Sequence, residues 1–256
     1  MQALVFASYG TADKEVQKRS LDAVVEDFRF EFPKVNVSQV FLSQHIREKL
    51  EARGETVPSV SLLLSMLKKD EVSEVYLQPG LIAAGDTYEK ELREVVASFA
   101  DSFDRIRLGE PLIASKKDAQ NFFVSLLSDL HVPPHTQLVL VGHGSAHRTS
   151  GAYARLQELA DEVGLPLHIG VFAEGSTPGQ RDVLARLSEA GDTSVLLAPL
   201  LLTSGYHART NIFGDEEASW KSALERAGYT VSCDRRGLGE YPLIRKMFVD
   251  KARALM

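Results

Sequence analysis

Short apolar runs alternate with segments of helical periodicity along nearly the whole chain, and this alternation limits the possible folds more than any other feature. Such alternation predicts right-handed βαβ units and a mostly parallel sheet, the arrangement of an α/β fold. The predicted strands are 3–8, 36–41, 74–77, 105–108, 137–141, 167–171, 194–198 and 230–233. The predicted helices are 14–30, 43–52, 59–69, 87–99, 116–130, 151–163, 180–190 and 215–227.

The second half of the chain repeats the pattern of the first. The segment ALVFASYGT near the start matches QLVLVGHGS near the middle, and SEVYLQPGLIAAGDTY matches TSVLLAPLLLTSGYHA. This repeat predicts two similar α/β lobes, each with a mostly parallel sheet flanked by helices, and a cleft between them. We place the first lobe at 1–131 and the second at 132–256, and we expect the helical segment 241–256 to be able to pack back on the first lobe.

Composition excludes several classes of protein. The net charge of −6 argues against a general nucleic-acid-binding protein, which is usually basic. One cysteine, Cys233, can form neither an internal disulfide nor a thiolate metal cage. The start of the chain has too short an apolar run for a signal peptide, and no window approaches the ~20 apolar residues of a membrane span. These features predict a cytoplasmic protein.

Histidines occupy two matched strand ends in the second half only. In the repeat, Tyr9 aligns with His143, and Thr87 aligns with His207. Ligands of open parallel sheets bind beyond the carboxyl ends of the strands, so both histidines fall where a ligand is expected. The second lobe therefore carries an ionisable pair able to bind a metal that the first lobe lacks.

A carboxylate follows a third strand of the same lobe. Glu174 comes just after the strand 167–171 and before a Gly-Ser-Thr-Pro-Gly turn. Two imidazoles and one carboxylate suit a borderline divalent cation such as cobalt, iron, nickel or zinc, and three protein ligands leave open positions for a reaction. The sequence thus predicts a metal site made of His143, Glu174 and His207.

Each of these residues also has an ordinary structural interpretation. Taken alone, His143 is a hydrogen-bonding group at a strand end, Glu174 a solvated loop residue or helix cap, and His207 the start of a helix. Their occurrence at matched positions of successive βα loops favours the metal site. His147 lies four residues after His143 in a predicted loop, where that spacing does not bring two histidines onto one metal.

Other motifs are absent. The Gly-His-Gly-Ser segment lacks both the GxxxxGK[ST] and the GxGxxG patterns, so a nucleotide site is not indicated. The chain also lacks the GxSxG pattern of an α/β-hydrolase.

The motifs together resemble a known family. The segments VGHGSAH, FAEG, LLLTSGYHARTNIFGDEEASWKSALERAG and GLGEYPLIRKMFVDKA are similar to the anaerobic cobalt chelatases, the CbiK-type sirohydrochlorin cobaltochelatases among the class II chelatases. ASYGTADKE and AAGDTYEKELREV are similar to the N-terminal lobe of that family. The resemblance covers nearly the whole chain and implies two similar lobes with a cleft.

The resemblance also implies roles for particular residues. The family binds its metal through two histidines and a glutamate, which fall on His143, Glu174 and His207. His143 corresponds to the residue taken as the proton acceptor, and Glu89 to a cleft residue that assists with protons or holds substrate. Further candidate substrate contacts at the strand ends are Ser8, Tyr9, Gly10, Leu81, Gly144, Arg148, Gly205 and Arg209.

The chemistry of the substrate gives these contacts a physical reason. Sirohydrochlorin is a flat macrocycle with many carboxylates, so an acidic protein needs local arginines such as Arg148 and Arg209 to bind it. Gly144 and Gly205 allow the backbone to approach the ring closely. Family members often carry a histidine where this chain has Leu81, and this departure leaves the exact tetrapyrrole and metal open.

The resemblance implies a lyase that inserts a divalent metal, Co2+ foremost, into sirohydrochlorin in cobalamin biosynthesis. Fe2+, Ni2+ and Zn2+ are alternative substrate metals, and no organic cofactor is expected. A ferrochelatase acting on sirohydrochlorin or a porphyrin, and a non-catalytic tetrapyrrole or metal carrier, are the alternative functions. The expected partners are the tetrapyrrole and the metal ion, without nucleic acid or membrane; a homo-oligomer is compatible with the sequence.

Overall fold

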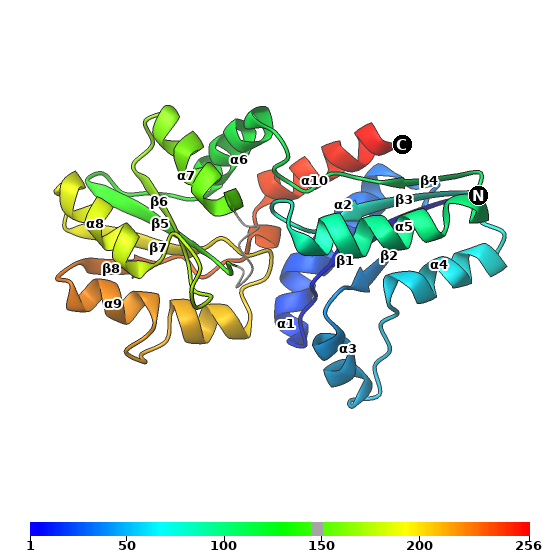
Figure 1. Ribbon diagram of the computed structural model, residues 1–256, viewed down its shortest axis with the longest axis horizontal. Helices are drawn as coiled ribbons and strands as arrows, with labels where there is room; N and C mark the ends of the chain where they lie inside the picture. Colours follow the sequence, from blue (N-terminus) through cyan, green and yellow to red (C-terminus); the bar gives the residue numbers. More distant parts are fainter. Residues whose placement is uncertain (145–150) are drawn as a thin grey trace. The chain divides into compact units, whose positions relative to one another are not determined.

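Two parallel sheets form the framework of the molecule. The computed structural model describes residues 1–144 and 151–256, and within these ranges the strands form two four-stranded sheets, ordered β2-β1-β3-β4 and β6-β5-β7-β8 (Figure 1). Every strand pair in both sheets is parallel. The predicted α/β class is confirmed, with one sheet in each half of the chain.

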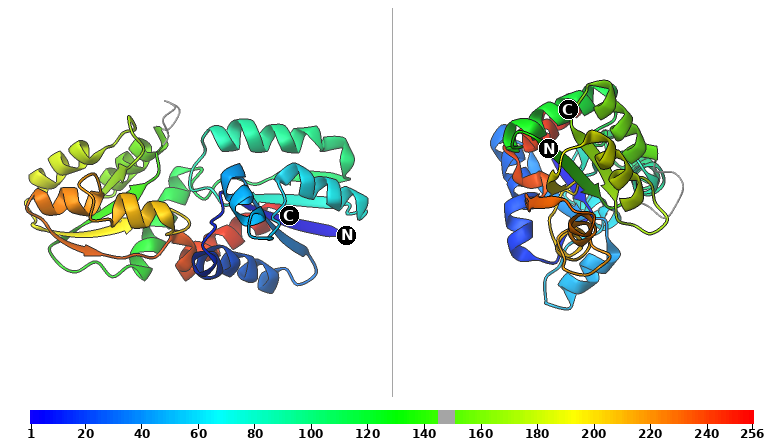
Figure 2. Two further views of the ribbon diagram at one scale, coloured as in Figure 1. Left: turned by 90° about the horizontal axis from the view of Figure 1, so that it is seen from below. Right: turned by 90° about the vertical axis from the view of Figure 1, so that its left-hand side faces the viewer.

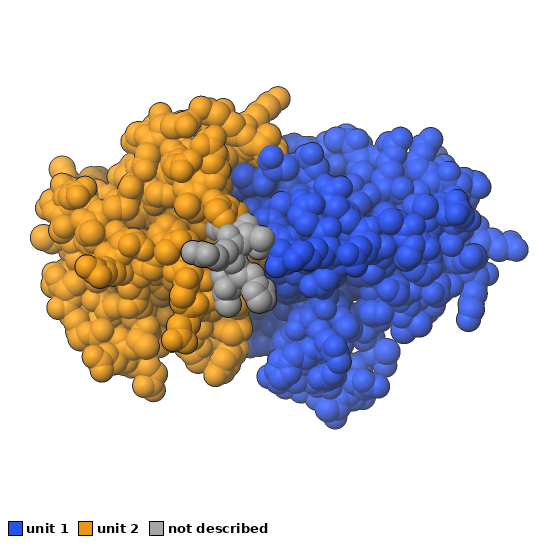
Figure 3. All heavy atoms as spheres, viewed as in Figure 1, with its two compact units in different colours: residues 1–114, 242–256 blue, residues 115–241 orange. Residues whose placement is uncertain are grey.

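The first compact unit comprises Met1–Ala114 and Pro242–Met256 (Figure 3). Its strands are β1 (Gln2–Ser8), β2 (Asn36–Phe41), β3 (Glu74–Pro79) and β4 (Arg105–Leu108). Its helices are α1 (Lys14–Gln17), η1 (Lys18–Asp22), α2 (Ala23–Glu31), α3 (Gln44–Glu51), α4 (Val60–Lys69), η2 (Thr87–Leu92), α5 (Arg93–Ser98), η3 (Ala100–Ser102) and α10 (Pro242–Leu255).

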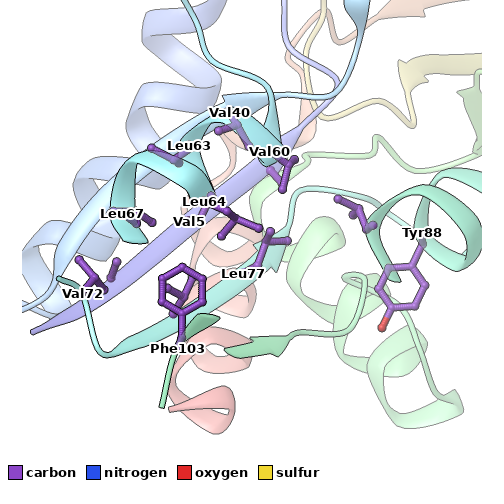
Figure 4. Close-up of a cluster of buried hydrophobic side chains, with 14 of the residues drawn as sticks. Val5, Val40, Val60, Leu63, Leu64, Leu67, Val72, Leu77, Tyr88 and Phe103 are labelled. Atoms are coloured by element: carbon purple, nitrogen blue, oxygen red, sulfur yellow. The ribbon is translucent and has the colours of Figure 1, made fainter. Parts of the chain in front are cut away.

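Helices cover both faces of this first sheet (Figure 2). On one face, alternate strand residues such as Val5 and Leu77 pack with the apolar side of α4, with Tyr88 of η2 and with Phe103 (Figure 4). On the other face, the ring of Phe6 makes edge contacts with Phe28 of α2 and Phe248 of α10, each at a centroid distance of 5.6 Å. Alternating side chains therefore give the sheet two buried faces.

The second compact unit comprises Ser115–Tyr241. Its strands are β5 (Thr136–Gly142), β6 (Leu167–Val171), β7 (Ser194–Pro199) and β8 (Thr230–Cys233). Its helices are α6 (Lys116–Asp129), α7 (Gly151–Glu162), α8 (Gln180–Ala190), η4 (Ala208–Ile212), α9 (Trp220–Arg226) and η5 (Leu238–Glu240). One cluster buries Val139, Val141, Val195 and Leu197 of the sheet against residues of α8, η4 and α9.

The observed units differ from the predicted lobes at their boundaries. Helix α6 belongs to the second unit because it packs on α7, whereas the sequence pattern placed it in the first lobe. Helix α10, the last element, contacts α2 and β3 of the first unit. The sequence pattern predicted one division after residue 131, whereas the structure divides after Ala114 and again after Tyr241.

The two units repeat each other residue by residue at the strand ends. In the first, Ala7 pairs with Pro79 and the Leu42 N–H donates to the Ser8 carbonyl at 2.8 Å. In the second, Val141 pairs with Pro199 and the Phe172 N–H donates to the Gly142 carbonyl at 3.2 Å. This register makes Tyr9 equivalent to His143, and Leu42 equivalent to Phe172. Thr87 is equivalent to His207, because the Glu89 N–H donates to the Gly85 carbonyl as the Arg209 N–H donates to the Gly205 carbonyl.

Several helical regions differ from the predicted pattern. The predicted helix 14–30 contains the π-helix η1, and the segment 87–99 begins as the π-helix η2 before it continues as α5. A further π-helix, η4, follows His207, outside the predicted helices. The predicted helix 215–227 begins only at Trp220, because the Ser219 hydroxyl accepts from the Ser222 N–H and caps α9 there. Within the described ranges, no helix has the length and apolar character that a membrane crossing requires.

A close contact beneath β6 provides a test of the second core. A Cβ placed on Gly170 would lie 2.1 Å from Cη2 of Trp220, whose side chain is only 1% exposed. We expect Gly170→Ala to lower the free energy of unfolding by about 1–3 kcal/mol, because a buried indole cannot move aside without disturbing its neighbours. Urea denaturation measures this change. Gly151→Ala is the control, since no described atom lies within 4 Å of its Cβ position; equal losses in the two variants would contradict the packing described.

A buried histidine makes the second unit sensitive to acid. His168 on β6 is 6% exposed; its Nε2 lies 3.0 Å from Oε1 of Gln137, and its Nδ1 lies 3.4 Å from Nε of Arg186. Burial, and then the charge of Arg186, lower the pKa of His168 to about 4. The neutral ring therefore donates to the glutamine and accepts from the guanidinium.

The pH dependence of stability follows from this lowered pKa. The unfolded chain binds the proton near pH ~6.5, well before the folded chain does, so stability falls as pH drops from that value toward 4. We expect a loss of about 2 kcal/mol from this group between pH 7.5 and pH 5. Urea denaturation at both pH values should show a smaller loss for His168→Gln; an unchanged loss would exclude His168 as the source.

Candidate functional site

Two imidazoles meet at the carboxyl ends of β5 and β7. His143 is the first residue after β5, and His207 immediately precedes the π-helix η4 that follows β7. Their ring centroids are 5.2 Å apart, and the ring planes are nearly perpendicular at 81°. Parallel pairing of the two strands, with Val141 opposite Pro199, brings these loops side by side. The sequence-predicted pair is thus brought together by the sheet.

The backbone at His143 is set by the glycine that follows it. Gly144 has a φ of +80°, a region that glycine adopts without the steric cost of a side chain. A Cβ at this position would lie 3.0 Å from the side chains of Ser176 and Val171. Gly10, which follows Tyr9 in the first unit, has the same kind of turn with a φ of +88°. A glycine turn therefore follows the first strand end in each unit.

The hydrogen bond of His143 fixes its tautomer. Nδ1 lies 3.0 Å from the carbonyl oxygen of Gly144, which can only accept, so Nδ1 carries the proton in the neutral ring. The lone pair then lies on Nε2. Because the side chain is exposed, this nitrogen is suited to bind a metal or accept a proton.

Two features of its environment lower the pKa of His207. Its ring stacks on Phe172 at a centroid distance of 5.4 Å and an angle of 23°, and its Nδ1 lies 3.4 Å from Nδ2 of Asn211. Partial desolvation of the ring lowers the pKa of His207, and the neighbouring His143 lowers it further, because two imidazolium ions at this distance repel. The neutral form, which a metal requires, therefore persists below the usual titration range of histidine.

The third predicted ligand lies on the neighbouring turn. Glu174 is exposed and follows Ala173, whose N–H donates to the His143 carbonyl at 2.8 Å. Among the residues that the structure describes, no three histidine, cysteine, aspartate or glutamate side chains are gathered closely enough to hold a metal ion. The structure therefore joins the two histidines and leaves Glu174 beside them on its own turn.

The predicted substrate contacts have different surroundings. Tyr9 is 54% exposed, and its hydroxyl donates to Oγ1 of Thr87 at 2.9 Å, so the first unit joins the equivalent strand-end positions by a hydrogen bond. Ser8 and Leu81 are buried, at 1% and 5% exposure, and Leu81 belongs to the hydrophobic core. In this structure both side chains are thus buried, one polar and one in the core.

The other predicted site residues also differ in how exposed they are. Gly205 is buried and its carbonyl accepts from the N–H of Arg209, whose side chain is exposed. Glu89 of η2 is exposed and forms an ion pair with Arg93 at 2.8 Å. Arg148, like His147, lies outside the described residues.

Phe172 is the site residue that sequence reasoning missed. Its ring contacts both imidazoles, at centroid distances of 4.8 Å to His143 and 5.4 Å to His207. The FAEG motif was noticed for its glutamate alone. A signal was present in the repeat, because the equivalent residue of the first unit, Leu42, is not aromatic.

The coupling between the imidazoles is measurable. We expect His207 to titrate below the usual value of ~6.5 in an NMR titration of the imidazole resonances. His143→Ala should raise the pKa of His207 by removing a like charge, but burial should keep it below the usual value. His45→Ala, which changes an exposed histidine of α3, is the control. An unchanged His207 titration in His143→Ala would show that the pair is not close in solution.

Comparison with known proteins places the chain in a family. A family model described as cobalt chelatase (CbiK) matches residues 2–256. A sirohydrochlorin cobaltochelatase of Salmonella typhimurium is 32% identical over 250 residues, which cover 97% of this chain and 94% of that protein. The sirohydrochlorin cobaltochelatase CbiKC of Nitratidesulfovibrio vulgaris is 29% identical over 258 residues, with 99% and 90% covered.

Solved structures agree in fold. SirB from Bacillus subtilis with Fe3+ superposes with a TM-score of 0.68 at 17% identity, over 99% of this chain and 95% of that one. CbiX, described as the terminal enzyme of siroheme biosynthesis in denitrifying bacteria, superposes with a TM-score of 0.60 at 17% identity, over the whole of both chains. With the family model matching nearly its full length, the chain belongs to the cobalt chelatase (CbiK) family.

Proposed function

We propose that this protein inserts a divalent metal ion, Co2+ foremost, into sirohydrochlorin. The observation that carries the proposal is the pair of imidazoles at the ends of β5 and β7 in a chain of the cobalt chelatase family. The related Salmonella and Nitratidesulfovibrio proteins bear the name sirohydrochlorin cobaltochelatase. Similar folds include a SirB with Fe3+ and a SirB in complex with cobalt, so Fe2+ is the second candidate metal.

The metal, as substrate, would bind to His143 and His207. Imidazole nitrogens and a carboxylate hold borderline divalent ions, and they exchange more readily than a thiolate cage. Nε2 of His143 has the free lone pair that ligation needs, because its Nδ1 proton is directed at the Gly144 carbonyl. At His207, ligation through Nε2 needs the Asn211 amide turned so that its oxygen accepts from Nδ1, and such amide flips exchange two similar groups.

Glu174 would complete the ligand set when the metal arrives. Its carboxylate is exposed, so turning it toward the imidazoles costs little desolvation. The turn that carries it is held at the His143 carbonyl by the Ala173 N–H, and Gly175, with a φ of +71°, follows directly. These features support a third ligand that joins the pair on metal binding.

Insertion exchanges two pyrrole N–H protons for the cation, so the site needs a proton acceptor. Imidazole is suited to accept protons near neutral pH. One nitrogen cannot ligate the metal and accept a proton at once, so His143 would release the metal to the macrocycle before Nε2 takes a proton. The exposed carboxylate of Glu89 is the proposed second proton acceptor, in the first unit.

Arginines would bind the carboxylates of the macrocycle. Arg209 is exposed two residues after His207, and its planar guanidinium can pair with a carboxylate through two hydrogen bonds. Arg148 is proposed for the same role from the sequence. Tyr9, exposed at the equivalent strand end of the first unit, is the proposed aromatic contact for the macrocycle.

An anaerobic insertion assay tests this function. The absorbance change of sirohydrochlorin would be followed with Co2+, and separately with Fe2+. We expect turnover by the native protein and a loss of at least about 100-fold in His143→Ala, because this change removes a ligand and a proton acceptor. Glu174→Gln should lose less and respond mainly in KM for the metal. His45→Ala should retain native turnover.

The alternative function predicts a different result. A carrier would bind sirohydrochlorin stoichiometrically without metal insertion, and His143→Ala would leave that binding unchanged. Such an outcome would contradict the chelatase proposal.

A further inference from the structure

The ring of Phe172 lies against both imidazoles of the site. It stacks on His207 with an interplanar angle of 23° and a centroid distance of 5.4 Å. It contacts His143 at 4.8 Å with the rings tilted by 59°. Both histidine side chains are exposed, so an exposed imidazole without such a neighbour would be free to change rotamer. One aromatic ring therefore restricts both.

The sheet fixes the position of this ring. The Phe172 N–H donates to the Gly142 carbonyl at 3.2 Å, and the next N–H, of Ala173, donates to the His143 carbonyl at 2.8 Å. These bonds extend the β5–β6 pairing past the ends of both strands, to His143 and Ala173. The Phe172 side chain is half-buried and packs against the hydrophobic cluster beneath η4 and α9. Its position depends on the framework of the unit and not on a free loop.

The first unit supplies an internal comparison. Leu42 occupies the position equivalent to Phe172, with the same hydrogen bond to the preceding strand, and it also packs against the core of its unit. The residues equivalent to the histidines, Tyr9 and Thr87, are joined by a direct hydrogen bond instead. The aromatic ring therefore occurs in the unit where two imidazoles must be held, and leucine fits the same backbone where they are absent.

We propose that Phe172 is a positioning residue that holds the His143 and His207 imidazoles in a geometry ready for a metal ion. The inference rests on the proposed function, because the metal that the imidazoles would bind is the substrate of that function. Immobilising a mobile side chain on binding weakens affinity by about two- to tenfold. A ring that holds two imidazoles in place beforehand removes much of that loss.

The first test uses Co2+ alone. Phe172→Leu is expected to fold, because leucine occupies the equivalent position of the first unit. We expect its affinity for Co2+, followed by visible absorption and calorimetry, to fall about tenfold. Phe172→Tyr retains the ring and should bind Co2+ within about threefold of the native protein. Phe30→Leu is the control, because it makes the same change at an 87% exposed position of α2.

The insertion assay separates positioning from chemistry. In Phe172→Leu, KM for Co2+ should rise about tenfold, whereas kcat at saturating Co2+ should stay within about twofold. Equal losses of kcat and of stability would instead indicate a structural role and would overturn the proposal.

The second test needs no metal. Because Phe172 stacks on His207, its ring current should shift the His207 ring protons upfield in the NMR spectrum. Phe172→Leu should remove this shift and broaden or average the signals of both imidazoles; Phe172→Tyr should keep it. Unchanged His207 signals in Phe172→Leu would overturn the proposal, whatever the metal does.

The two tests also separate the proposal from the function on which it rests. A native protein that binds no Co2+ would contradict the proposed function, and the NMR comparison would then decide the role of Phe172 alone. If Phe172→Leu binds Co2+ as tightly as the native protein does, that result would overturn the positioning role and leave the proposed function intact.

Discussion

Parallel pairing of β5 with both of its neighbours is the interaction on which the rest of the site depends. Val141 pairs with Pro199 of β7, and the ladder to β6 continues past the strand ends to the His143 carbonyl. Parallel strands end at a common edge, so three loops distant in sequence emerge together. The two imidazoles and the Phe172 ring, which contacts both, lie at that edge because of the strand register.

The two units show that the chemistry lies in the side chains and not in the framework. Both have the same strand order, the same glycine turn after the first strand and a π-helix after the third strand. π-Helical turns are rare and often occur at functional sites. At equivalent positions, the first unit has a tyrosine and a threonine, whereas the second has two histidines. The proposed metal ligands therefore belong to the second unit.

The sequence predicted the framework well, because it rests on strong local patterns. The strands form where the apolar runs lie, and the strand pairing and the loop hydrogen bonds agree with the alignment of Tyr9 with His143 and of Thr87 with His207. The approach of the two histidines follows from that alignment, since strand ends in one parallel sheet are neighbours. The unit boundary was misplaced because the packing of α6 on α7 leaves no periodicity in the sequence.

Other features depend on packing that a pattern does not encode. Phe172 comes just after the predicted strand 167–171, and only the fold shows that its ring contacts both imidazoles. Ser8 and Leu81 were candidate substrate contacts at strand ends, yet their side chains are buried. Glu174 lies on a turn after β6, and the strand pattern does not predict the side-chain direction of a turn residue.

The central claim is that His143 and His207 bind the metal that this protein inserts, and anomalous diffraction at the cobalt edge tests it most directly. Crystals of the native protein would be grown anaerobically with Co2+. The account predicts one strong peak about 2.0–2.2 Å from a ring nitrogen of each histidine, with the Glu174 carboxylate turned toward it. A cobalt peak held by other residues, with both imidazoles left uncoordinated, would contradict the account.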